Sequence, residues 1–268
     1  MNIETKYRKE LANAKRVVIK VGTRVITQSS GEPDLNQLKK LSDQVAKKHK
    51  LGHEMLMVSS GAVGAGVAAL GMKERPTHVP DLQMCAAVGQ AKLMAHYDNF
   101  FKAHMIIIGQ VLLTHADFYH KIRLENAKRT IRHMIRNRVV PIINENDVVN
   151  DEEIKAVMSL GDNDYLASRV VDLVEADLLI ILSTVDGVLD HNGKRVPYIE
   201  DIDSAFDLVD SRHKSSALSK GGMKSKLSAT KRALKSGCKV VIANGRAEKI
   251  ITDIITGKNR GTLLMNAE

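Results

Sequence analysis

The chain has no tryptophan, and aromatic residues make up only 3% of its 268 residues. Proteins that bind nucleic acids commonly stack bases on aromatic side chains, so this scarcity argues against such a role. A formal net charge of +9, from 40 Lys and Arg against 31 Asp and Glu, nevertheless favours anionic partners. Because many basic residues occupy helical segments that can simply face solvent, charge alone does not identify the partner. We expect no nucleic-acid partner.

Cysteine and long apolar runs are also scarce. The two cysteines, Cys85 and Cys238, are far apart and form no metal-binding or CxxC spacing, so we expect reduced thiols of an intracellular protein. No apolar run approaches the 18 residues of a membrane span. The first 16 residues lack the apolar segment of a secretory signal. These features predict a soluble, cytoplasmic protein with no membrane association.

Short β-branched runs alternate with amphipathic stretches along the whole chain. We predict strands over 16–22, 54–61, 105–113, 139–145, 177–183 and 239–244, and helices over 34–52, 81–103, 116–137, 164–175, 222–236 and 247–256. A final GTLL can add an edge strand, and 186–221 is the least regular part. The alternation predicts an α/β fold, a three-layer sandwich with a mostly parallel central sheet covered by helices on both faces.

Polar or glycine residues follow the predicted strands directly. In a parallel sheet the carboxyl ends share one edge, where ligands of open α/β sheets bind. The residues brought to this edge are Lys20 and Gly22, then Ser59, Ser60 and Gly61, then 144–147, and finally Ser183, Thr184 and Asp186.

Three of these motifs each allow two interpretations. Lys20, inside an apolar strand, either points to solvent from a sheet edge or reaches a partner in a site. The turn SSGAVGAG (59–66) either binds an anion at a helix N-terminus or packs helix and sheet tightly. The segment SKGGMKSK (219–226) is either a basic loop that closes over nucleotide phosphates or a solvated loop.

The stretch from Pro141 to Leu166 contains INEND and GDND, two clusters of carboxylates and carboxamides. Alone, such clusters are often turns. Neither has the alternating ligands and central glycine of a calcium loop. Together, beside the lysine–glycine motifs, they favour a site for a zwitterionic or cationic ligand.

The motifs VIKVGT, VSSGAVGAG, LQMCAAVGQAKLM, GQVLLT, PIINENDVV, GDND, LIILSTVDG and SKGGMKSKLSA occur in this order and resemble the amino acid kinase family. The resemblance runs from about residue 16 to the closing GTLL. The combination of INEND and GDND is similar to the family members that phosphorylate glutamate. It implies a carbamate kinase-like fold in one domain, 1–268, with a substrate lobe over about 1–165 and a nucleotide lobe over about 166–268. The RNA-binding-like C-terminal domain of many bacterial relatives is expected to be absent.

The resemblance implies an enzyme that uses ATP and Mg²⁺ to phosphorylate the side-chain carboxylate of L-glutamate, the first step toward proline. It implies catalytic roles for Lys20, Lys226 and Asp164, with Asp164 orienting both lysines. The implied glutamate-binding residues are Ser60, Gly61, Asn144, Asp147, Asp162 and Asn163. The implied ATP-binding residues are Lys20, Gly22, Ser183, Thr184, Ser219, Lys220, Gly221, Gly222, Met223, Lys224 and Ser225, where backbone N–H groups at Gly22 and Gly61 would cradle phosphate or acyl oxygens.

No metal-ligating residue is implied, because Mg²⁺ would be held mainly through ATP. The resemblance also implies a homodimer or homotetramer, proline as a feedback inhibitor, and contact with the downstream glutamyl phosphate reductase.

Two departures from the family pattern bear on the site. About five residues, 156–160, lie as an insertion before GDND, and the glycine loop begins with Ser-Lys where the family has Gly-Thr. Two alternatives therefore stay open: another carboxylate or phosphate kinase of this fold, or a non-catalytic sensor of amino acids or nucleotides. The pair Lys20 and Lys226 with Asp164 argues against the sensor, because binding alone would not require both lysines.

Overall fold

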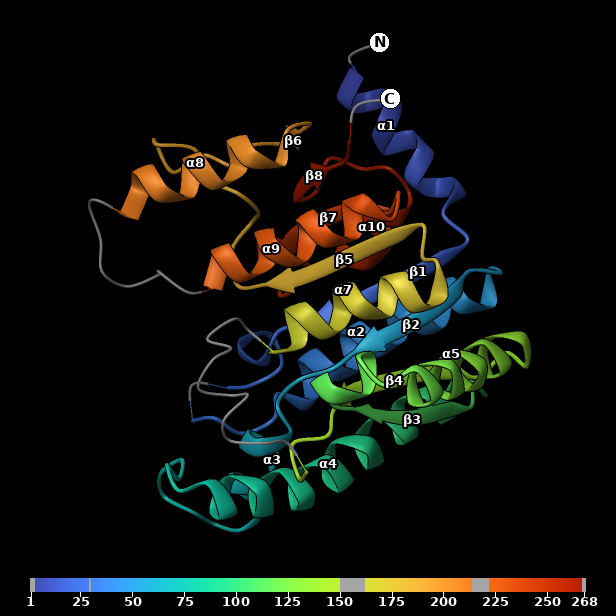
Figure 1. The fold of residues 1–268 in the computed structure, drawn as a ribbon, viewed down its shortest axis with the longest axis vertical. Coiled ribbons are helices and arrows are strands. Elements are labelled where there is room, and N and C mark those ends of the chain that lie inside the picture. Colours follow the sequence, from blue (N-terminus) through green and yellow to red (C-terminus); the bar gives the residue numbers. More distant parts are fainter. Residues whose placement is uncertain (1–2, 29, 150–161, 214–221, 267–268) are drawn as a thin grey trace.

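The computed structural model describes residues 3–28, 30–149, 162–213 and 222–266. One eight-stranded sheet runs through the molecule (Figure 1). In spatial order its strands are β3 (Ile108–Leu113), β4 (Val140–Glu145), β2 (Glu54–Val58), β1 (Arg16–Val21), β5 (Leu178–Ser183), β7 (Lys239–Asn244), β8 (Thr262–Leu264) and β6 (Tyr198–Ile199). All neighbours pair in parallel except β7 and β8.

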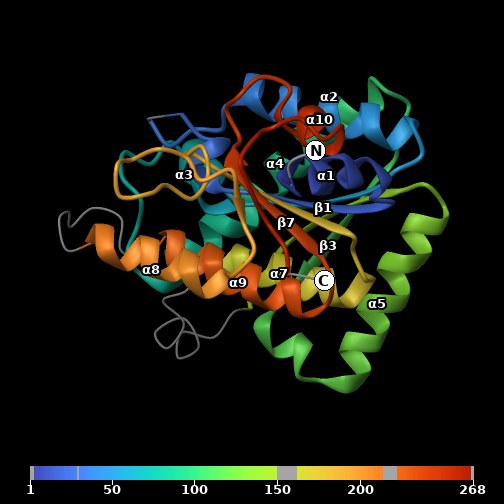
Figure 2. The ribbon, with the colours of Figure 1, turned by 90° about the horizontal axis from the view of Figure 1, so that it is seen from above.

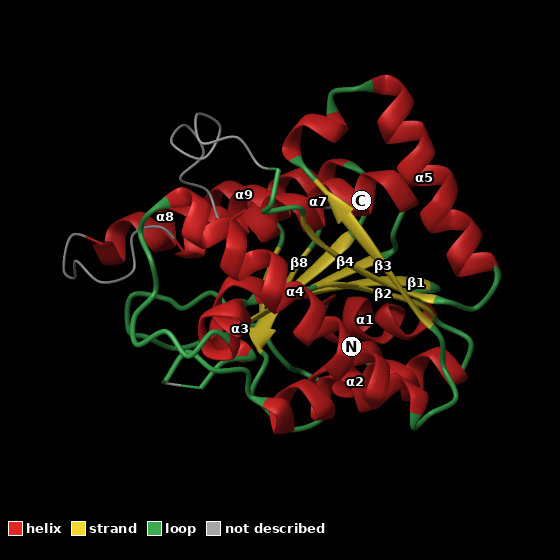
Figure 3. Ribbon diagram, turned by 90° about the horizontal axis from the view of Figure 1, so that it is seen from below, coloured by secondary structure: helices red, strands yellow, loops and turns green. Residues whose placement is uncertain are grey.

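Helices cover both faces of the sheet, as Figures 2 and 3 show from opposite sides. One face carries α1 (Ile3–Glu10), α2 (Leu35–Lys50), α4 (Val79–Lys102) and α10 (Ile250–Ile255). The other carries α5 (Lys121–Arg136), α7 (Asp162–Val174), α8 (Ile202–His213) and α9 (Gly222–Lys235). The helix α3 (Ala62–Ala69) packs on α4, and single 3₁₀ turns lie at η1 (Leu11–Asn13), η2 (Thr23–Val25) and η3 (His115–Phe118). The predicted three-layer α/β fold is confirmed.

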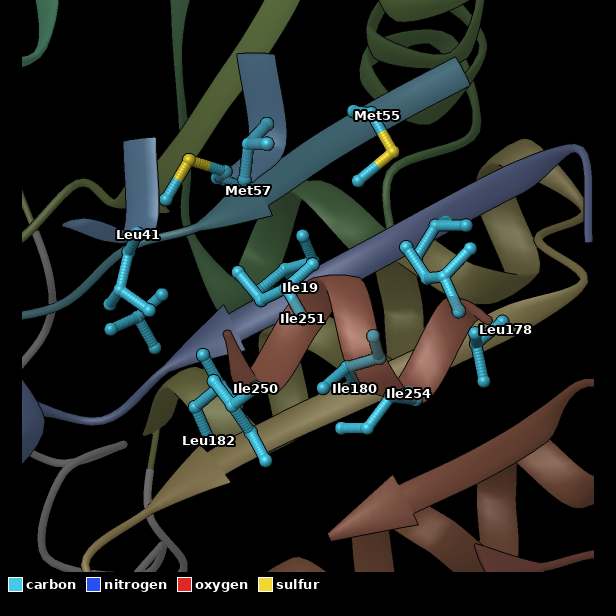
Figure 4. Packing of buried hydrophobic residues seen from close by; sticks show 14 of the residues in the cluster. Ile19, Leu41, Met55, Met57, Leu178, Ile180, Leu182, Ile250, Ile251 and Ile254 are labelled. Carbon is cyan, nitrogen blue, oxygen red and sulfur yellow. The ribbon is translucent and has the colours of Figure 1, made fainter. Parts of the chain in front are cut away.

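Strand alternation divides the core into two layers. In β1, Val17, Ile19 and Val21 pack toward α2 and α10, whereas Val18 packs toward α7 and α9. Figure 4 shows the first layer, in which Ile19 lies among side chains of β2, β5 and α10. Because side chains of a strand alternate between its faces, Lys20 shares the face of Val18. The sequence therefore directs the lysine toward the side of the sheet that carries α7 and α9.

Most predicted elements are present, with bounds shifted by a few residues. The stretch predicted as one helix over 116–137 is instead η3 followed by α5, and the His120 side chain accepts a hydrogen bond from Arg123 N where α5 begins. The predicted edge position of GTLL is wrong. This segment forms β8, which lies between β7 and β6 and runs antiparallel to β7. The least regular part of the sequence contains β6 and α8, and α1 was not predicted.

Candidate active site

Lys20 lies near the carboxyl end of β1, a central strand that pairs with β2 on one side and β5 on the other. The interpretation of Lys20 as a solvent-facing lysine at a sheet edge is therefore wrong. Only 6% of the residue is exposed, so its ammonium needs a partner inside the protein. That partner is Asp164, whose Oδ1 lies 2.7 Å from Lys20 Nζ.

Asp164 connects three elements of the fold. It lies in the first turn of α7, and its second carboxylate oxygen, Oδ2, lies 3.2 Å from Nζ of Lys226 in α9. The Ser225 hydroxyl donates to the same oxygen over 3.1 Å, and Lys226 Nζ also donates to Gly222 O over 2.9 Å. Two ammonium groups from β1 and α9 thus converge on one carboxylate that is only 2% exposed.

Burial and charge act in opposite directions on the pKa values of this group. Burial raises the pKa of Asp164, but the nearby ammoniums of Lys20 and Lys226 outweigh it, so the pKa lies below its usual value. Burial lowers the pKa of Lys20, and the charge of Lys226 lowers it further, against the opposing effect of Asp164. The carboxylate is therefore ionised at neutral pH, while Lys20 loses its proton more readily than an exposed lysine.

Gly22 follows β1 directly and has a role that differs from the one expected. Its N–H donates to Leu182 O over 3.1 Å, so this group is already engaged within the protein and does not provide a free donor for a phosphate. A Cβ at this position would lie 3.1 Å from Leu182 O and 3.7 Å from Lys20 Nζ. A side chain here would therefore crowd Leu182 O, and it would be in van der Waals contact with the Lys20 ammonium.

The amide of Asn163 joins the two polar clusters of the sequence. Its Nδ2 lies 2.8 Å from Ser59 O, 2.8 Å from Ser60 Oγ and 3.2 Å from Asn144 Oδ1. One side chain of α7 thereby connects the ends of β2 and β4 across the carboxyl edge of the sheet. Since Asn163 precedes Asp164 in the chain, this network lies directly beside the pair of lysines.

Two residues of α4 that were not predicted complete this network. Gln90 Oε1 accepts from Asn144 Nδ2 over 2.8 Å, and the buried Tyr97 hydroxyl lies 2.9 Å from Ser59 Oγ. Tyr97 is one of the buried residues of α4, and Gln90 is half-buried at helical spacing from Ala86 and Leu93. The sequence indicated this only by placing a glutamine at helical spacing among the apolar residues of this helix.

The turn after β2 owes its small residues to tight packing between two helices. Gly61 caps α3 with φ +92°, which is the left-handed region that favours glycine. A Cβ on Gly89 of α4 would lie 1.8 Å from Ala62 O, and one on Gly66 would lie 1.8 Å from Cys85 O. The small residues of this turn are therefore required by close packing of α3 on α4, not by the helix–sheet packing expected from the sequence. Anion binding by the turn stays a prediction.

The remaining predicted residues differ in how well they can be placed. Asp147 is half-buried just after β4, and Asp162 begins α7. Ser183 ends β5 in register with Asn244 of β7, followed by the exposed Thr184. Met223, Lys224 and Ser225 follow Gly222 in the first turn of α9. Ser219, Lys220, Gly221 and the insertion 156–160 lie outside the described residues.

Other structural features bear on cofactors and membranes. Within 3–28, 30–149, 162–213 and 222–266, no group of three or more His, Cys, Asp or Glu side chains is arranged to hold a metal ion. The carboxylate of Asp164 already faces two lysines. Cys85 and Cys238 are buried and free, as expected. No helix in the described part of the chain combines the length and apolarity needed to cross a membrane.

Comparison with known proteins identifies the family. Residues 15–244 match the model of the amino acid kinase family. The chain belongs to the amino acid kinase family. Among curated amino acid kinases, it is 39% identical to the glutamate 5-kinase of Clostridium acetobutylicum, over 99% of this chain and 98% of the relative. It is 40% identical to the glutamate 5-kinases of Thermoanaerobacter sp. and Herminiimonas arsenicoxydans, covering 93% and 95% of this chain and 68% of each relative.

Solved structures support the amino acid kinase fold. Carbamate kinase from Giardia lamblia bound to AMP-PNP superposes with a TM-score of 0.66 at 18% identity, over 96% of this chain and all of that one. N-acetylglutamate synthase from Neisseria gonorrhoeae, complexed with coenzyme A and L-arginine, gives 0.65 at 14% identity over 98% of this chain. This chain spans 64% of that synthase. At these identities the likeness concerns the fold alone.

Proposed function

We propose that this chain transfers the γ-phosphoryl group of ATP to the side-chain carboxylate of L-glutamate, forming γ-glutamyl phosphate and ADP, the first step of proline biosynthesis. The observation that carries the proposal is the convergence of Lys20 and Lys226 on Asp164, directly beside the amide network of Asn163 and Asn144. The similarity to glutamate 5-kinases over nearly the whole chain supports the choice of substrate.

The chemistry requires positive charge more than it requires a base. A carboxylate is already a nucleophile at neutral pH. One of its oxygens attacks the γ-phosphorus, and the bond from that phosphorus to the bridging oxygen of ADP breaks. The obstacle is repulsion between two anions, which amounts to about 4 kcal/mol for unit charges about 4 Å apart at an effective dielectric of 20. Catalysis therefore depends on positioning and on fixed positive charge.

Lys20 and Lys226 supply that charge from a central strand and from a helix. An ammonium has three donors, so each lysine can contact Asp164 and still donate to a phosphoryl oxygen. Asp164 holds both ammoniums in place, and its charge opposes the lowering of the Lys20 pKa by burial. Its role is to orient the lysines, while the lysines stabilise the charge that develops on the transferred group.

In this proposal, the amide network binds glutamate. The α-ammonium requires acceptors, which Asp147 and the carbonyl oxygen of Asn163 provide. Asn144 holds the Asn163 side chain in place, because its own Oδ1 already accepts from Glu145 N and Asn163 Nδ2. The carboxylates require donors, which the Ser60 hydroxyl and backbone groups near Gly61 provide. Asp162, at the start of α7, belongs to the same edge of the sheet.

In this proposal, ATP binds on the side of Lys20 and Lys226 that faces away from the amide network of Asn163 and Asn144. Gly22, Ser183, Thr184 and the first turn of α9 from Gly222 to Ser225 line its site, together with Ser219, Lys220 and Gly221 of the preceding segment. Mg²⁺ supplies positive charge to the ATP phosphates. The donor set among the described residues fits an ion held through those phosphates and water, because Asp164 is engaged by two ammoniums.

Family membership also supports several finer proposals. The part over about 1–165 forms the substrate lobe, and the part over about 166–268 forms the nucleotide lobe. The enzyme works in the cytoplasm as a homodimer or homotetramer. Proline acts as a feedback inhibitor, and the labile product passes to glutamyl phosphate reductase.

Hydroxylamine trapping tests the proposed activity. Hydroxylamine converts an acyl phosphate into a stable hydroxamate, which is measured alongside ADP release with glutamate, N-acetylglutamate, aspartate or no acceptor. Hydroxamate formation with glutamate alone is the expected result. Binding of glutamate and ATP without turnover would contradict the proposal and favour a sensor.

A further inference from the structure

Gln90 contributes a polar amide to the amide network of Asn163 and Asn144. It comes from α4, whereas Asn163 comes from α7, and these two helices cover opposite faces of the sheet. Gln90 Oε1 accepts from Asn144 Nδ2 over 2.8 Å. The orientation of this contact is fixed, because Asn144 Oδ1 already accepts from Glu145 N over 2.9 Å and from Asn163 Nδ2 over 3.2 Å. Asn144 therefore donates to Gln90 through its NH₂ group, and Gln90 accepts through its Oε1 oxygen.

The other end of the Gln90 amide is a buried donor. Gln90 Nε2 is shielded from solvent and has no hydrogen-bond partner within the described ranges. The same holds for Asn163 Oδ1, a buried acceptor of the same network. Buried polar groups without partners cost free energy and are uncommon in folded proteins. One donor and one acceptor in one network fit a ligand that carries both an anionic and a cationic group.

The order of contacts indicates which part of the amino acid Gln90 reaches. The carboxylate that accepts the phosphoryl group must lie at Lys20 and Lys226, next to Asp164. Asn163 is adjacent to Asp164 in the chain, whereas among the hydrogen bonds of the described residues Gln90 is joined to Asn163 through Asn144. Gln90 is therefore the member of this chain of contacts furthest from the reacting end, and the α-carboxylate is the anionic group at the other end of glutamate.

We propose that Gln90 is a substrate-binding residue whose Nε2 donates to the α-carboxylate of the bound amino acid while its Oε1 holds the amide of Asn144. This inference rests on the proposed function and adds a specificity-determining contact to it. Gln90 then selects an acceptor with a free α-carboxylate, and Asn163 Oδ1 accepts from the neighbouring ammonium.

The test compares glutamate with isoglutamine, in which the α-carboxylate is a carboxamide and the side-chain carboxylate is unchanged. Gln90→Glu keeps an oxygen for Asn144 and replaces the NH₂ donor with a second oxygen. It should lower kcat/KM for glutamate roughly 10- to 100-fold, mainly through KM, because a hydrogen bond to a charged group is lost and two carboxylates face each other. Isoglutamine can donate its own NH₂ group to Glu, so its kcat/KM should fall much less.

The decisive readout is the ratio of kcat/KM for glutamate to that for isoglutamine. We expect at least a tenfold decrease of this ratio in Gln90→Glu and no change in Gln110→Glu, which makes the same substitution at an exposed position of β3. If Gln90→Glu does not fold, Gln90→Met provides the measurement. It retains the volume, removes both hydrogen bonds, and should also lower the ratio.

Equal losses for both substrates would overturn the proposed contact and leave Gln90 with a positioning role only. Kinetic constants that are unchanged in Gln90→Glu and in Gln90→Met would overturn the proposed contact as well. Wild-type protein that forms no hydroxamate from glutamate would contradict the proposed function instead. In that case calorimetric binding of glutamate and isoglutamine to the same variants still tests the contact, with the same shift in affinity ratio expected.

Discussion

The ammonium of Lys20 lies 2.7 Å from a carboxylate oxygen of Asp164, although the two residues, one in a central strand and one in the first turn of α7, are 144 positions apart in the chain (164 − 20). Both side chains are almost fully buried. A buried ion pair is a weak source of stability, because desolvation offsets most of the Coulombic attraction. Its position at the carboxyl edge of the sheet, with Lys226 on the second oxygen, is better explained by a need for fixed positive charge.

Replacement of Lys226 should affect turnover more than substrate binding. In Lys226→Ala, we expect kcat to fall roughly 10²- to 10³-fold, because a charge that stabilises the transferred phosphoryl group is lost. The KM for glutamate should change little, since the amide network around Asn163 does not include this lysine. Steady-state kinetics with both substrates separate the two parameters. Loss of glutamate affinity with unchanged kcat would show that the role assigned to Lys226 is wrong.

The alkaline side of the pH–rate profile should report Lys20. Burial lowers the pKa of this lysine, and activity requires its charged form, so kcat should decline as pH rises through that lowered pKa. Asp164→Asn removes the charge that opposes this lowering. The decline should therefore begin at lower pH in Asp164→Asn than in the wild type. A decline at the same or higher pH in the variant would contradict the coupling.

Asp164→Asn should also destabilise the protein. Two lysines, with side-chain exposures of 8% and 13%, would lose their counter-charge. Breaking a buried ion pair by removing one partner costs about 3–5 kcal/mol. Urea unfolding at neutral pH measures the loss. Thr230→Ala serves as a control, because its buried hydroxyl lies in α9 without a hydrogen-bond partner in the described part of the chain.

Asp147 should contribute to glutamate affinity. The residue follows β4 at the edge where Asn144 joins the amide network, and it is half-buried. In Asp147→Ala, the loss of an acceptor for the α-ammonium should raise the KM for glutamate by roughly tenfold or more and leave the KM for ATP unchanged. An unchanged glutamate KM would remove Asp147 from the substrate site.

The contact between α3 and α4 should tolerate no side chain at Gly89. In Gly89→Ala, the new Cβ would lie 1.8 Å from Ala62 O and 2.3 Å from Gly66 N, so α3 must move away. We expect a loss of about 1–3 kcal/mol in unfolding free energy and a higher glutamate KM, because α3 follows Ser60 and Gly61.

Gly64→Ala is the matched control for this substitution. It lies in α3, the helix that Gly89 of α4 approaches, and within 4 Å its Cβ would meet only Gly31 O, at 3.1 Å. The gain in helix propensity of alanine over glycine should offset this contact. Equal destabilisation by both substitutions would mean that the close approach of α3 and α4 is not what requires glycine at position 89.

Much of the fold could be predicted because its strands are apolar, well spaced and separated by amphipathic helices. The elements that were missed have weak local signals. The strand β6 has two residues, and α1 is short and strongly charged. The place of β8 between β7 and β6 depends on long-range pairing, to which three residues of sequence give no clue. Local patterns therefore predicted the sheet but not the order at its far edge.

In the site, too, some residues could be predicted from local sequence and others depend on long-range packing. Lys20 could be singled out because a lysine inside an apolar strand requires a partner or solvent. The roles of Asp164 and Lys226 were expected from the resemblance to the amino acid kinase family. Gln90 and Tyr97 were missed because they lie mid-helix on a largely apolar face, and only the packing of α4 against the ends of β2 and β4 brings them to Asn144 and Ser59. Sequence patterns indicate which residues reach the edge of the sheet from its own strands. They do not show what a neighbouring helix adds.

The central claim is that a side-chain carboxylate oxygen of glutamate attacks the γ-phosphorus of ATP. Glutamate labelled with ¹⁸O in that carboxylate tests it directly. The attacking oxygen becomes the bridge of the acyl phosphate, and hydroxylamine attack at the acyl carbon releases phosphate that carries this oxygen. ³¹P NMR should show one ¹⁸O in each phosphate released with a hydroxamate. Phosphate without the label would mean that water or another group accepts the phosphoryl group, and would contradict the proposed reaction.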